Sequence, residues 1–122
     1  MRVAVWLVTV MSVAGIATGC SSKSQSAKVT AEKLQKSFEK AEPSVAQEVV
    51  QAGSAFQAGN YSQAVLIMDR VAQTQRMDDT QKKAVDDLIT QTRQAVQRNP
   101  KLDSPQLYQA VSDLFIKVHP EN

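Results

Sequence analysis

Cysteine and histidine, two common nucleophiles and bases of enzymes, are rare in this 122-residue sequence. The sequence contains one cysteine, Cys20, and one histidine, His119. A disulfide within the chain would need a second cysteine, and a metal site would need several further ligands. His119 lies between Val118 and Pro120 near the end of the sequence, where we expect it to be exposed and without a catalytic role. The serines therefore lack a histidine base within the fold. The sequence predicts no catalytic residues, no enzymatic activity and no cofactor.

Two acidic pairs are the remaining candidates for binding a metal ion. Asp78 and Asp79 come before a predicted helix, and Asp86 and Asp87 lie within it. Acidic residues are ordinary at these positions, because they favour the first turn of a helix and its solvated face. The sequence has no calcium loop, zinc-protease motif, phosphate-binding glycine loop or nucleophile elbow. We therefore expect no metal site.

The residues before Cys20 have the composition of an export signal. Arg2 supplies one positive charge, and the fifteen residues from Val3 to Ala17 carry none. A transmembrane helix needs about 20 apolar residues, so this run is short for one. Its length suits the apolar region of a secretory signal.

The sequence Ala17-Thr18-Gly19-Cys20 resembles the lipobox of bacterial lipoproteins. That family has an aliphatic residue, usually Leu, then two small residues and the cysteine, and Ala17 departs from the Leu. The resemblance implies that residues 1–19 are removed and that Cys20 is lipidated on its thiol and its new amine. A plain secretory signal with an incidental cysteine, and a retained membrane anchor, are the alternatives. Ser21 stands where an Asp tends to retain such proteins at the inner membrane. The resemblance thus implies an outer-membrane protein facing the periplasm if the source is Gram-negative.

The residues after Cys20 divide into a short polar segment and one domain. Residues 21–28, SSKSQSAK, contain no large apolar side chain, so we expect residues 20–28 to form a lipidated, flexible tether. Residues 29–122 then form the folded domain. Residues 20–122 carry thirteen Lys and Arg against twelve Asp and Glu, interspersed along the chain. Without a basic stripe, we expect no binding of nucleic acid.

Apolar residues recur at helical spacing through this domain and predict an all-α, antiparallel bundle of about five helices. The stripes contain Leu34 and Phe38; Val45, Val49 and Phe56; Val65, Met68 and Val71; Val85, Leu88 and Ile89; and Leu107, Val111, Leu114 and Phe115. Pro43, Gly59 and Asn99-Pro100 mark three of the breaks between them. We expect Asn60, Asp78 or Asp79, and Ser104 to cap helices. At the second helix, Ser44 with Gln47 has the spacing of a capping box, and Pro43 as the first helical residue is the alternative.

The stretch from Ala52 to Ala72 resembles a tetratricopeptide repeat. In that family a small residue of the first helix is followed by a Gly-x-Tyr turn and by a second small residue three positions after the Tyr. The corresponding residues here are Ala52, Gly59, Tyr61 and Ala64. The resemblance implies a helical hairpin over about residues 44–77, the 34-residue length of one repeat. The family's early Trp and Leu and its final Pro are missing, and residues 78–111 do not repeat the pattern.

Two functional classes follow from these features. The first is a lipid-anchored, helical protein-interaction module whose partners are membrane lipid, through Cys20, and an unknown envelope protein. The second is a structural spacer that forms a helical oligomer, favoured by the heptad-like spacing from Leu34 to Phe56 but opposed by Pro43. We expect the last helix to close the end of the bundle. If it is instead a detachable arm, Leu107, Val111, Leu114 and Phe115 are its candidate partner face.

Overall fold

The computed structural model describes the backbone of residues 21–120 and the side chains of residues 26–120. The proposed signal, residues 1–19, and Cys20 lie outside this range. The described part folds into α1 (Ser21–Ser37), α2 (Pro43–Gln57), α3 (Tyr61–Thr74), α4 (Asp79–Arg98) and α5 (Pro105–Val118), with a 3₁₀ turn, η1 (Pro100–Leu102), before α5. Residues 21–120 contain no strand. The predicted all-α fold with five helices is confirmed.

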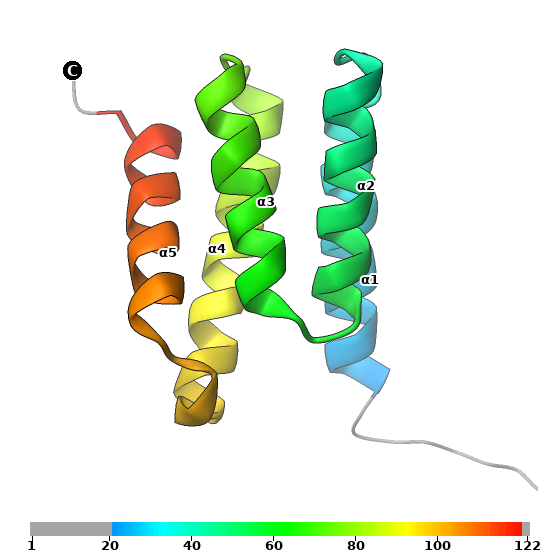
Figure 1. Ribbon diagram of the computed structural model, residues 1–122. Coiled ribbons are helices and arrows are strands. Elements are labelled where there is room, and N and C mark those ends of the chain that lie inside the picture. Colours follow the sequence, from blue (N-terminus) through cyan, green and yellow to red (C-terminus); the bar gives the residue numbers. More distant parts are fainter. Residues whose placement is uncertain (1–20, 121–122) are drawn as a thin grey trace, which may run out of the picture.

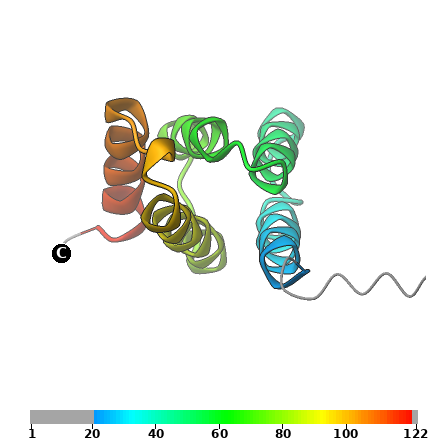
Figure 2. The same ribbon diagram turned by 90° about the horizontal axis from the view of Figure 1, so that it is seen from below.

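The helices run alternately up and down, with short connections at both ends of the bundle (Figure 1). α1 packs against α2 and α4, α2 packs against α3, and α5 packs against α3 and α4. The view along the helices shows α1 and α2 on one side, α3 and α4 in the middle, and α5 beside them (Figure 2). From the apolar stripes we expect the helix of Leu34 and Phe38 on one side of the α2–α3 hairpin and the helix of Val85, Leu88 and Ile89 on the other. The main neighbour of α3 on that side is instead α5.

One core joins all five helices. Its large apolar members with no more than 2% of their surface exposed are Leu34, Phe38, Val49, Phe56, Val65, Met68, Val71, Val85, Leu88, Ile89, Leu107 and Leu114. These residues come from every predicted apolar stripe, so the helical periodicity of the sequence predicts which face of each helix is buried.

The helix starts follow the local sequence closely. Asp78 accepts a hydrogen bond from the Gln81 N–H at 2.8 Å, and Gln81 Oε1 accepts one from the Asp78 N–H at 3.0 Å. The Asn60 and Ser104 side chains accept from N–H groups in the first turns of α3 and α5. At α2, Pro43 is the first helical residue and Glu42 makes no side-chain cap. The capping box of Ser44 and Gln47 is therefore wrong, and its alternative is right.

The prediction of a flexible tether over residues 20–28 is also wrong for residues 21–28, because α1 begins at Ser21. Ala27 packs against the core, and Thr30 and Ala31 are buried. No Pro or Gly occurs between Ser21 and Ala41 to break a helix. Adding a residue to a packed helix costs much less than nucleating one, so the helix extends through the serine-rich segment.

Candidate functional site

An open groove lies where the C-terminal half of α1 meets the first turns of α4. This groove has a volume of about 680 Å³, and its rim includes the α1–α2 turn and the α3–α4 loop. A long-range hydrogen bond holds its floor, since the Gln81 amide of α4 donates to the Ser37 carbonyl of α1 at 3.1 Å. Farther along the same seam, Gln91 of α4 donates to the Thr30 hydroxyl of α1. The two walls are thus fixed relative to each other.

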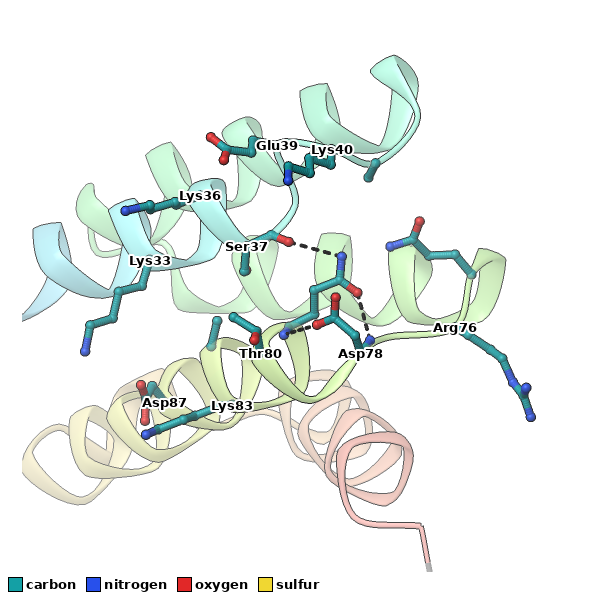
Figure 3. A pocket seen from close by; sticks show the side chains of 14 residues that line it. Lys33, Lys36, Ser37, Glu39, Lys40, Arg76, Asp78, Thr80, Lys83 and Asp87 are labelled. Atoms are coloured by element: carbon teal, nitrogen blue, oxygen red, sulfur yellow. Dashed lines mark hydrogen bonds between the residues drawn. The ribbon is translucent and has the colours of Figure 1, made fainter.

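The groove is lined mainly by charged side chains. Its cations are Lys33, Lys36, Lys40, Arg76 and Lys83, and its carboxylates are Glu39, Asp78 and Asp87. Figure 3 shows Lys33 and Lys36 extending from α1, and Lys83 and Asp87 from α4 on the facing wall, while Arg76 points away from the others. The α1 side, taken with the turn that follows it, thus carries three lysines and one carboxylate, Glu39, and the α4 wall is mixed in charge.

The groove lysines make no ion pair with any carboxylate of residues 26–120. The ion pairs in that range lie elsewhere, between Arg70 and Glu48, between Lys117 and Asp69, and between His119 and Asp86. Lysines at 33, 36 and 40 are exposed, and their aliphatic stems can cover apolar surface while the ammonium groups stay hydrated. The charges on this wall are therefore available to an incoming anion.

The polar groups on the groove floor already have structural roles. Asp78 and Gln81 form the capping box of α4, and the Ser37 hydroxyl donates to the Leu34 carbonyl at 2.8 Å. The lining includes no histidine or cysteine that could act as a base or nucleophile. The chemistry that this groove offers is electrostatic binding.

The four residues of the predicted hairpin lie on α2, on α3 and in the turn between them. Ala52 and Ala64 are fully buried, and α2 and α3 pack closely against each other. Gly59 has a φ of 82°, in the left-handed region that favours glycine. The Tyr61 ring meets Phe56 edge to face, with 5.4 Å between ring centroids. A smaller hollow of about 500 Å³ adjoins this pair at the other end of the bundle from the groove.

The candidate partner face of α5 lies mostly in the core. Leu107, Val111 and Leu114 are buried, so a partner could reach them only if α5 left the bundle. Phe115 is 36% exposed and lies under the Arg93 guanidinium, 4.8 Å from the ring centroid. The apolar residues that α5 exposes most are Tyr108 and Ile116.

The acidic pairs do not assemble a metal site within the described residues. Asp78 caps α4, and Asp86 lies 2.9 Å from Nε2 of His119. No group of three or more potential metal ligands occurs among the described residues. Among the same residues, no helix combines the length and hydropathy needed to cross a membrane.

Comparison with known protein families, with curated proteins and with solved structures finds no match for this chain. The sequence alone did not predict this groove, although Lys33, Lys36 and Lys40 recur at spacings of three and four. That spacing is a helical signal. The groove forms because α4 packs beside α1, and no short stretch of the sequence indicates that packing.

Proposed function

We propose that the chain is a lipid-anchored protein of the bacterial cell envelope and that its helical bundle binds another protein without catalysing a reaction. The anchoring part rests on the lipobox-like residues Ala17 to Cys20 and on the charge-free run before them. The resemblance to lipoproteins supports an outer-membrane location facing the periplasm in a Gram-negative source.

The observation that carries the protein-binding part is the open groove between α1 and α4. Its walls are fixed by the Gln81–Ser37 hydrogen bond, and its α1 side presents lysines that form no ion pair with a described carboxylate. A preformed groove with available charge suits recognition of a partner, because little ordering is needed on binding. The likeness of the α2–α3 hairpin to a tetratricopeptide repeat, a protein-binding unit, supports the same proposal.

The structural spacer is the weaker alternative. The heptad-like stripe that favours it runs from Leu34 to Phe56 in the sequence. In the structure this stripe is divided between α1, which ends at Ser37, and α2, which begins at Pro43 and packs back against α1. Both halves face the same core, so the stripe does not form a continuous seam for a long coiled coil.

Site-specific photo-crosslinking in a bacterial host that expresses the full chain tests the proposal. The crosslinking amino acid replaces Lys40 in the groove, Tyr108 on the exposed side of α5, or Lys101 near the other end. We expect at least one position to give a discrete adduct with a different membrane-fraction protein, and Cys20→Ser to abolish it by removing the anchor. Adducts formed only between copies of the chain would contradict protein binding and favour the spacer.

A further inference from the structure

The lysines on the α1 wall of the groove form a row rather than a cluster. Lys33 and Lys36 lie on α1, and Lys40 follows in the turn between α1 and α2, so the three positions succeed one another along one side of the groove. All three side chains are exposed. A single phosphate group is best held by donors that converge on one point, often with arginine or backbone N–H groups among them. A row of separated ammonium groups instead fits an anion whose charges are themselves spread along a line.

The shape of the site selects among extended anions. The lysines border a hollow of about 680 Å³ between two helices. A lipid surface is flat and would meet the rim of such a hollow without filling it. An extended peptide can lie in the groove, and carboxylates on alternate residues recur about every 6.6 Å. Such a segment could therefore bring successive carboxylates to Lys33 and Lys36 on α1 and to Lys40 in the turn that follows.

The position of the groove also favours a peptide over lipid headgroups as the bound anion. α1 has 17 residues and therefore rises about 25 Å from Ser21, the residue that follows Cys20, to Ser37 at the groove. This distance exceeds the Debye length of about 8 Å at physiological ionic strength. Along the length of α1, headgroups at the acylated residue are thus too distant to neutralise the groove lysines.

We propose that the groove between α1 and α4 binds an acidic, extended segment of a partner protein, with its carboxylates along Lys33, Lys36 and Lys40. This inference rests on the proposed protein-binding function and names the chemistry of the partner. The α4 wall adds a cation, Lys83, and two carboxylates, Asp78 and Asp87. Those carboxylates would repel a segment that is acidic on both sides, so the preferred ligand carries its acidic residues on one side and small or basic residues on the other.

Fluorescence anisotropy with labelled peptides tests this directly. The protein is residues 21–122, which contain all the described helices and their core. The probe is a peptide of alternating Glu and Ala, and its control is the same peptide with Lys in place of Glu. We expect the acidic peptide alone to bind, with an affinity that falls as salt is raised from about 50 to 500 mM because exposed charges are screened.

Paired charge reversals locate the binding. Lys36→Glu with Lys40→Glu should weaken the acidic peptide about tenfold or more, since two exposed attractions become repulsions. Lys28→Glu with Lys101→Glu changes the net charge equally at two exposed positions outside the groove and should weaken it less than about threefold. All four positions are exposed, so both double variants should keep the melting temperature of the wild type.

Three results would overturn the groove inference. The first is no binding of the acidic peptide. The second is an equal loss in both double variants. The third is tighter binding to vesicles of anionic lipid, or to inorganic phosphate, than to the peptide. These outcomes remain separate from the proposed function, because crosslinks from Tyr108 to another protein would still support protein binding through a different surface.

Discussion

Gly59 is the residue at which the fold depends most on backbone conformation. Gly59 lies in the turn between α2 and α3 and has a φ of 82°. The N–H of the next residue, Asn60, donates to the Ala55 carbonyl at 2.8 Å. This is the geometry that satisfies the last carbonyls of a helix through a left-handed residue. The next residue then caps α3, so one glycine sets the direction of the whole α2–α3 hairpin.

Gly59→Val should lower the free energy of unfolding by about 1–2 kcal/mol, because a β-branched residue is strained at positive φ. Apart from Gly59 and its two chain neighbours, no residue has a heavy atom within 4 Å of the position that a Cβ would occupy, so a steric clash with the rest of the fold would not contribute. Urea denaturation of residues 21–122 measures the change. Gly59→Asn is the matched control and should lose less, since Asn tolerates the left-handed region. Equal stability of the wild type and the Val variant would contradict this role.

Local signals of this kind are where the sequence predicts most. Asn60, Asp78 and Ser104 cap helices as expected, because a capping side chain acts on backbone groups two or three residues away. Gly53 is an example of a position whose role such local signals do not predict. A Cβ on this buried residue would lie 3.4 Å from the Ala31 Cβ of α1. The close approach of α2 to α1 at this point depends on tertiary packing, and no neighbouring residue in the sequence indicates it.

At the scale of elements, α5 is part of the bundle. It contributes Leu107, Val111 and Leu114 to the core and packs against both α3 and α4. The Lys117 ammonium of α5 lies 2.9 Å from Oδ1 of Asp69 on α3. Asp69 has only 8% of its surface exposed. A mostly buried carboxylate is costly without a partner, so α5 stabilises α3 by charge as well as by apolar contact.

Removal of residues 100–122 should therefore expose the apolar side of α3 and leave Asp69 without its cation. We expect the shortened chain to self-associate or aggregate and to melt at a lower temperature, as shown by size-exclusion chromatography and thermal denaturation. Ile116→Ser, on the 65% exposed surface of α5, is the control and should change stability by about 0.5 kcal/mol or less. A shortened chain that stays monomeric and equally stable would identify α5 as a detachable arm.

The positions of the helices along the sequence, and their buried faces, were easier to predict than which helices pack against each other. Periodicity indicates which face of each helix is apolar, and all five apolar faces are buried. The packing of α5 on α3 and of α4 on α1 cannot be predicted in this way, because periodicity shows that a face is apolar but not which other apolar face it contacts. For this reason the groove between α1 and α4 could not be predicted, although its lysine row is visible in the sequence.

At the scale of the whole molecule, α1 links the proposed anchor to the groove. It begins at Ser21, the residue after Cys20, in place of the flexible tether that the serine-rich sequence predicts. In our proposal the bundle is therefore held close to the lipid without a spacer, and the groove lies about 25 Å along α1 from the anchor. Anchoring through Cys20 is thus the central claim, because it sets where the protein acts.

The intact mass of the protein purified from the membranes of a bacterial host is the most direct test of this claim. The account predicts a chain that begins at Cys20 and is heavier than residues 20–122 by a diacylglyceryl group and an N-linked acyl chain. Two or three acyl chains, each contributing about 0.8 kcal/mol per buried CH₂, would hold such a protein firmly in the membrane. Cys20→Ser should lack every acyl group. An unmodified mass for the wild type, either starting at residue 20 or retaining residues 1–19, would contradict the account.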